Sequence, residues 1–249
     1  MLASALGCLG AALSMTLPWP QVWRSVARRR TTGLSASACW LGVALPIGWI
    51  TYGLLRGDHI QVVTNSVTGG AAAVILAALL LTRADLRTAR TLMLSASGAA
   101  GVVLAATLIA ATAALPGRSG PEAAAVLGVV LAGTTVVAAI PQPLSLLRDR
   151  AQDLSGLSPL RWRLGAGACT SWLGYGLITA QPGVWVSAGA GLGAALIVCT
   201  MLVRGARVPA AVRTPARGVA RVRPLADAPT LVIPALAVLR RPARSLVAA

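Results

Sequence analysis

Long apolar runs separated by short polar gaps make up most of the chain. Seven runs can be marked, at residues 3–23, 34–55, 60–82, 91–115, 122–147, 157–179 and 183–203. A helix needs about 20 mostly apolar residues to cross the hydrocarbon core of a bilayer, and each run is of that order. We therefore predict an all-α membrane protein of seven transmembrane helices, with sequential helices antiparallel because the gaps are short.

The composition agrees with a membrane location. Of the 249 residues, 56% are hydrophobic and 11% are charged, whereas about 25% of residues are charged in a soluble domain. Arginine is the only strongly basic residue type, and Ala, Gly and Val abound, as is typical of high-GC bacterial genomes. All four cysteines lie inside apolar runs without CxxC spacing, which favours membrane-buried thiols over a metal or disulfide set. We expect no metal, no cofactor and no enzymatic activity.

The arginines decide the topology. Arg56 and Arg118 lie in gaps on one side of the predicted membrane, and the rest of the 22 lie on the other side or in residues 204–249. The positive-inside rule then places the N-terminus outside and the C-terminus in the cytoplasm of a plasma-membrane protein. Topology accounts for the net charge of +16, so we expect no nucleic-acid partner. Residues 204–249 read as a disordered Arg/Pro-rich cytoplasmic tail held against anionic lipid.

Two halves of the chain carry the same ordered motifs. Pro20-Gln21 in "LPWPQVWR" matches Pro141-Gln142 in "AIPQPLSLLR", and "GLS" occurs at 33–35 and 156–158. "WITYG" (49–53) matches "WLGYG" (172–176), at a constant offset of 123 from the GLS triplet onward. We predict two parallel three-helix repeats joined by a linker helix, a 3+1+3 plan. The predicted boundaries are 1–90, 91–117 and 118–203, with the tail at 204–249.

A PQ pair ending helix one, GLS opening helix two and W..YG closing it resemble the PQ-loop superfamily. The resemblance, over residues 3–203, is in particular to the SWEET (MtN3/saliva-type) sugar facilitators. It implies hinges for alternating access, and kinked helices can bend where straight ones cannot. By this resemblance the hinge residues are Pro20, Gln21, Pro141, Gln142 and Pro159.

The same resemblance implies a sugar pocket lined by a tryptophan late in helix two and an asparagine sixteen residues later. Trp49 and Asn65 fit, and they lie eight residues either side of Gly57, so they have equal depth on adjacent helices. In the second half Trp172 fits, but Ala188 replaces the amide and Ser187 is its polar neighbour. The predicted substrate-binding residues are Trp49, Asn65, Trp172, Ser187 and Ala188.

The acidic residues bear on the mode of transport. All six fall in loops, at helix ends or in the tail, and we expect Asp58 and His59 to be solvated in a turn. Proton-driven carriers need an ionisable group within the membrane. The prediction is therefore a facilitator for a small neutral solute, most simply a sugar, in contact with lipid. Two alternatives stay open: a proton-coupled amino-acid exporter resembling cystinosin, and a receptor or scaffold on the same fold. Homo-oligomerisation also stays open.

Overall fold

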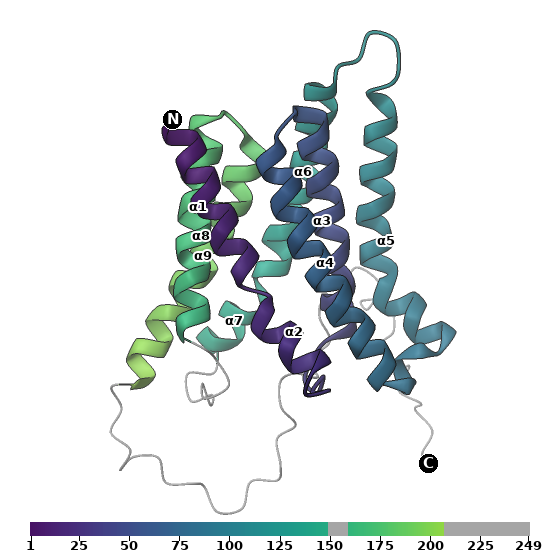
Figure 1. Ribbon diagram of the computed structural model, residues 1–249, viewed down its shortest axis with the longest axis vertical. Coiled ribbons are helices and arrows are strands. Elements are labelled where there is room, and N and C mark those ends of the chain that lie inside the picture. Colours follow the sequence, from purple (N-terminus) through teal and green to yellow (C-terminus); the bar gives the residue numbers. More distant parts are fainter. Residues whose placement is uncertain (149–158, 207–249) are drawn as a thin grey trace, which may run out of the picture.

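The computed structural model describes residues 1–148 and 159–206, and the regular structure of these residues is entirely helical (Figure 1). The second GLS triplet and the predicted tail from residue 207 lie outside the described residues. The helices, in chain order, are α1 (Leu2–Thr16), α2 (Trp19–Val26), α3 (Ala36–Arg56), α4 (His59–Thr82), the 3₁₀ helix η1 (Ala84–Arg87), α5 (Ala89–Thr112), α6 (Gly120–Ala139), α7 (Pro141–Arg148), α8 (Pro159–Ile178) and α9 (Pro182–Ala206).

Six segments of the described chain are long and apolar enough to cross a membrane. They are Leu2–Val26, Ala36–Arg56, His59–Thr82, Ala89–Thr112, Gly120–Ala139 and Pro182–Val203. The seventh predicted span corresponds to α8, which contacts α1 and α9 inside the bundle. Arg161 and Arg163, among the first five residues of α8, lower the hydropathy of this helix. The prediction of an all-helical, seven-helix membrane protein is confirmed, and the chain is a multi-pass membrane protein.

Helix contacts follow the predicted internal repeat. In the first half α4 contacts α1, α2 and α3, and in the second half α9 contacts α6, α7 and α8. The third helix of each predicted unit therefore contacts the other two. Between the halves, α1 packs against α8 and α3 against α6, so the first helix of each unit meets the second helix of the other. The linker α5 packs on α3 and α6 at the edge of the bundle (Figure 1). These contacts fit the 3+1+3 plan, whose domain boundaries stay a prediction.

The turns after α3 and α8 repeat one another in detail. Gly57 and Ala180, at the offset of 123, have positive φ angles of 67° and 51°. Glycine tolerates this left-handed conformation and alanine adopts it at a cost. The residue that follows each closes the turn through the same backbone hydrogen bond of 2.8 Å, from Asp58 N to Gly53 O and from Gln181 N to Gly176 O.

The buried core lies between α3, α5 and α6. Leu127 and Leu131 of α6 are fully buried there, beside Tyr52 of α3. Close approach of α6 and α9 depends on facing glycines, since a Cβ on Gly183 would lie 2.7 Å from the Gly128 Cα. Small residues permit such approach in membranes, where lipid offers helices little hydrophobic drive to associate. Apolar residues on the outer surfaces, such as Leu104 of α5, are exposed and suit contact with lipid tails.

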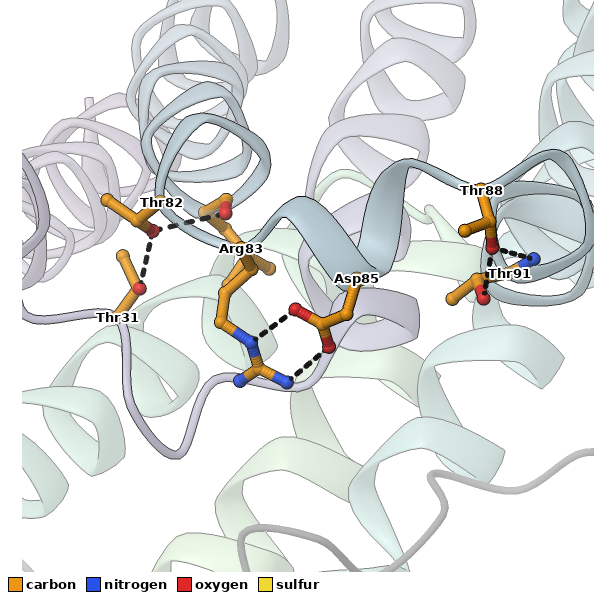
Figure 2. Close-up of polar contacts among 7 residues, drawn as sticks. Thr31, Thr82, Arg83, Asp85, Thr88 and Thr91 are labelled. Carbon is orange, nitrogen blue, oxygen red and sulfur yellow. Dashed lines mark hydrogen bonds and ion pairs between the residues drawn. The ribbon is translucent and has the colours of Figure 1, made fainter.

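Figure 2 shows how the α4–η1–α5 connection is held at the end of the bundle opposite the Asp58 turn. Thr31, in the loop after α2, contacts Thr82 at the end of α4 with an O–O distance of 2.7 Å. Arg83 donates twice to Asp85, at 3.0 and 2.8 Å, and these hydrogen bonds lower the pKa of the Asp85 carboxyl. Both side chains are solvent-exposed, so the pair adds little to stability. Thr88 caps α5 by accepting from Thr91 N.

Candidate functional site

One cavity of about 280 Å³ opens between the two halves of the bundle. Its walls combine aromatic, amide and hydroxyl side chains with a few apolar ones, and none of the described residues that line it is charged. The lining comes from α1, α3, α4, α6, α8 and α9: Ser14, Trp49, Gln61, Thr64, Asn65, Thr68, Thr135, Cys169, Trp172, Val184, Ser187 and Ala188. All five residues predicted to bind substrate from the sequence are therefore brought together, although their role in binding stays a prediction.

The two tryptophans are held by equivalent aromatic contacts. Trp49 packs edge-on against Tyr52 with ring centroids 5.3 Å apart, and Trp172 packs edge-on against Tyr175 at 5.5 Å. The Trp172 indole also donates to Ser14 Oγ at 3.0 Å, which ties α8 to α1. A fixed aromatic face in a cavity suits the apolar face of a small ligand, because its polar edge is satisfied elsewhere.

The α4 side of the cavity is polar. Asn65 Nδ2 donates to Gln61 O at 2.9 Å and to Gln61 Oε1 at 3.1 Å. Thr64 and Thr68 donate their hydroxyl hydrogens to backbone carbonyls one turn back, at 2.7 and 3.0 Å. Their oxygens keep lone pairs and can accept hydrogen bonds from a ligand. This side therefore offers several acceptors at helical spacing.

The α9 side is much less polar. Val184 and Ala188 are both buried, and neither has a side chain that forms hydrogen bonds. Ser187 donates its hydroxyl hydrogen to Gly183 O at 2.6 Å, which leaves only the oxygen as an acceptor. Ser187 thus supplies less than the missing amide, since it cannot also donate to a ligand while this bond persists.

A buried hydrogen-bond network joins the two halves one turn beyond the cavity. Asp58 Oδ2 accepts from Tyr175 Oη at 2.6 Å and from Gln181 Nε2 at 3.1 Å. Asp58 Oδ1 accepts from Gln61 N at 3.2 Å and so caps α4. Asp58 is only 9% exposed. The expectation of a solvated Asp58 is therefore wrong, because donors from α8 and the α8–α9 turn replace its water. His59 is exposed, but it is the first residue of α4 rather than part of the turn.

The first helix of each half is broken near its PQ pair. The first break falls between α1, which ends at Thr16, and α2, which has Pro18 as its N-cap; Ser14 O accepts from Leu17 N instead of from residue 18. The second falls between α6 and α7, which begins at Pro141. Pro18 is the N-cap of α2 and Pro20 is the second residue of that helix, so Pro18 rather than Pro20 lies at the break.

The other predicted hinge residues lie beside these breaks or at a helix start. Pro20 is in the first turn of α2, and Gln21 Nε2 donates to Ser25 Oγ at 3.1 Å within that helix. The side chains of Pro141 and Gln142 lie outside the described residues. Pro159 is the first residue of α8, where a missing N–H costs nothing. Their role as hinges stays a prediction.

Sequence reasoning missed Gln61, Ser14 and Pro18. Gln61 carries a detectable signal, because it precedes Asn65 by one helical turn and thus shares its face. Ser14 has no such signal, since its importance arises from Trp172, 158 residues away. In the parts of the chain that the structure describes, no group of three or more His, Cys, Asp or Glu side chains could hold a metal ion.

Comparison with known proteins found a matching family model and a solved structure of similar fold. The PQ-loop repeat family model matches residues 2–62. The fold is similar to the solved structure of a eukaryotic SWEET transporter, with a TM-score of 0.65 and 15% sequence identity, over 82% of this chain and 97% of that one. No curated protein matches. The chain is therefore similar to the PQ-loop repeat family in its first 62 residues, and it shares the fold of a SWEET transporter over most of its length.

Proposed function

We propose that the protein is a membrane facilitator that moves a small neutral solute, a sugar, down its gradient by alternating access. The observation that carries the proposal is the cavity itself. It lies between the two halves of the chain, is uncharged, and is lined by a tryptophan from each half together with amide and hydroxyl groups. Sugars present apolar C–H faces and hydroxyl edges, which match aromatic faces and amide groups respectively.

The size of the cavity supports a solute no larger than a monosaccharide. At about 280 Å³ it falls near the lower end of the range of about 300–1,000 Å³ typical of small-molecule pockets. A peptide-sized ligand needs more room. The receptor or scaffold alternative therefore lacks support from the cavity.

The Asp58 network supports alternating access. Tyr175 and Gln181 of the second half bond to Asp58 of the first half, so the two halves are drawn together beyond one end of the cavity. A carrier must separate its halves at one end while they close at the other. We propose that this network closes one end, and that the helix breaks at Pro18 and Pro141 let the first helix of each half bend.

The arginine distribution supports an orientation. We propose that the Asp58 turn faces outward, and that the opposite end, with Arg24, Arg83 and Arg87, faces the cytoplasm of a plasma membrane. In the same reading, residues 1–90 and 118–203 form the two repeats and residues 91–117 the linker.

One observation favours a second candidate, a proton-coupled exporter of amino acids. The buried Asp58 is an ionisable group of the kind that such carriers need. It does not line the cavity, however, and its Oδ2 atom already accepts from two protein donors. Facilitated diffusion is the simpler function for this geometry.

Uptake by proteoliposomes tests the proposal. The purified full chain is reconstituted, and uptake of radiolabelled monosaccharides and amino acids is measured with and without a pH gradient. We expect equilibration of at least one monosaccharide that is indifferent to the gradient. Accumulation of an amino acid above its outside concentration, driven by pH alone, would favour the exporter; no uptake of any sugar would refute the facilitator.

A further inference from the structure

The two faces of the cavity that come from α4 and α9 occupy equivalent positions in the repeats but differ in chemistry. The offset of 123 relates Gln61 to Val184 and Asn65 to Ala188. Gln61 and Asn65 are one turn apart on α4, and their side chains are hydrogen-bonded to each other. On α9 both positions are apolar. A pair of linked amides thus faces a pair of aliphatic side chains across a cavity that the repeats would otherwise make symmetric.

The hydrogen bonds fix which amide atoms remain available. Asn65 is bonded to the Gln61 backbone carbonyl, so the bonding atom must be its nitrogen, and both hydrogens of that nitrogen are engaged. The Gln61 atom bonded to this nitrogen must then be its oxygen. Gln61 Nε2 and Asn65 Oδ1 have no partner among the described residues. The pair therefore presents to the cavity the two N–H donors of Gln61 Nε2 and, beside them, the acceptor Asn65 Oδ1.

The position of Gln61 determines what can accept hydrogen bonds from its side chain. Gln61 is only 4% exposed, and it lines the cavity. Among the described residues, the fully buried side-chain atoms that lack a partner are Trp40 Nε1 and Gln181 Oε1, so Gln61 Nε2 is not sealed off and can be reached from the cavity. Since the cavity is the space that Gln61 lines, a solute there can satisfy these donors.

We propose that Gln61 is a solute-binding residue that donates to an oxygen of the solute, while Asn65 Oδ1 accepts from a neighbouring hydroxyl. The inference rests on the proposed function and deepens it. The recognised chemistry is a pair of adjacent oxygens, at least one of them a hydroxyl, on one edge of a small polyol ring. Val184 and Ala188 meet the opposite edge and form no hydrogen bond there. The solute therefore binds in one orientation, and specificity is set by the edge that faces α4.

Two variants of Gln61 separate direct binding from support of Asn65. Gln61→Leu removes the donors and also the acceptor that holds Asn65. Gln61→Glu keeps an acceptor for Asn65 Nδ2 but removes the donors toward the solute. If Gln61 binds solute, both variants lose affinity, by about 5- to 150-fold. If Gln61 only positions Asn65, the Glu variant binds like the parent, and the proposal is wrong.

The test measures binding of D-glucose and its monodeoxy analogues to the purified full chain by competition against radiolabelled D-glucose. In the parent, deoxygenation on the edge facing α4 should weaken binding strongly and deoxygenation on the far edge little. In Gln61→Leu, removing the hydroxyl at one or more of these sensitive positions of the sugar should no longer weaken binding. Ser66→Ala is the matched control, because Ser66 is an exposed hydroxyl residue of α4 that does not line the cavity.

The outcomes distinguish this inference from the proposed function. A parent that binds no sugar refutes the proposed function, and the inference falls with it. A parent that binds glucose while every deoxy penalty persists in both Gln61 variants refutes the inference alone. Melting temperatures of all variants in detergent, close to that of the parent, show that a lost affinity is not a loss of fold.

Discussion

The Asp58 side chain makes two of its three hydrogen bonds with the half of the protein to which it does not belong. Its Oδ2 atom accepts from Tyr175 and Gln181 of the second half, and its Oδ1 atom caps its own helix. Hydrogen bonds to a charged acceptor contribute about 1.5–3 kcal/mol, roughly twice a neutral one. A single carboxylate can thus hold the closed end of the cavity.

Removing the Tyr175 hydroxyl should loosen that end. Tyr175→Phe removes the 2.6 Å hydrogen bond to Asp58 and changes little else. The conformation in which this end of the cavity is open should therefore become more populated. Cys169 lines the cavity and can report this if the other three cysteines are replaced by alanine. We expect an impermeant maleimide, applied to sided membrane vesicles from the Asp58 side, to modify Cys169 several-fold faster in the variant.

The equivalent tyrosine supplies the control. Tyr52 lies at the offset of 123 from Tyr175 and packs on Trp49 in the same way, but it has no hydrogen bond to Asp58 in the described part of the chain. Tyr52→Phe should leave the modification rate near that of the parent. Equal acceleration in both variants would mean that the hydroxyl bond does not hold the end closed.

Asn65 and Ala188 test the asymmetry of the cavity. Asn65→Ala removes an acceptor for the solute and frees Gln61, so solute affinity should fall by about 5- to 150-fold. Ala188→Asn should be tolerated or should raise affinity, because it restores an amide at the equivalent place. Both are measured by competition binding in detergent. An Asn65→Ala variant that binds like the parent would place the solute elsewhere.

The family resemblance and the spacing of the motifs were enough to predict five of the twelve residues that line the cavity, and too little to predict their hydrogen bonds. Trp49 and Asn65 are sixteen residues apart around one turn, so equal depth follows from helix geometry. The burial of Asp58 does not follow, because its partners Tyr175 and Gln181 come from a hairpin more than 100 residues away. From the sequence alone, a residue in a turn is predicted to be solvated, because the position of the other half of the protein is not known.

At the scale of helices, the two breaks near the PQ pairs stand at equivalent points. Hydropathy predicts one continuous span in each place, since leucine, isoleucine and alanine continue through the break. The structure ends α1 at Thr16 and begins α2 at Trp19, and it separates α6 from α7 at Ile140. The sequence contains the cause, proline, but several prolines lie together, and only the broken hydrogen-bond pattern identifies the one at the break.

We expect Pro18→Ala to slow transport more than Pro20→Ala. At position 18 an N–H could again donate to Ser14 O, which would let α1 continue into α2. Pro20 lies in the first turn of α2, where N–H groups lack helical partners in any case. The measurement is the initial rate of uptake by proteoliposomes that contain equal amounts of protein. It is made for Pro18→Ala, Pro20→Ala and Pro141→Ala. If the Pro18 and Pro141 variants both transport at the parental rate, the breaks are not hinges.

At the scale of the whole molecule, a nearly symmetric frame carries asymmetric chemistry. Equivalent turns, equivalent Trp–Tyr pairs and equivalent contacts between the halves are repeated. At the positions where the halves meet, the residues differ: Asp58 corresponds to Gln181, and Asn65 to Ala188. In the function that we propose, the symmetric frame would let the two halves rock about one site. Because Asp58 corresponds to Gln181, this end has a hydrogen bond from an amide to a carboxylate, and it avoids the repulsion between two carboxylates.

A carboxylate on each side of this contact should therefore create a pH switch. Gln181→Glu, which keeps the side-chain length, places a second carboxylate where Gln181 Nε2 now lies 3.1 Å from Asp58 Oδ2. Two carboxylates that share such a site raise the pKa of one of them, so at low pH they share a proton and stay together. As the pH rises through that raised value, both ionise and repel, and the end opens. Modification of Cys169 from the Asp58 side should then be much faster at pH 8 than at pH 5 in the variant. In the parent, after correction for thiol reactivity with a free cysteine standard, the two rates should differ little. A variant that shows no dependence on pH beyond that correction would mean that Asp58 and position 181 do not face each other across the closed end.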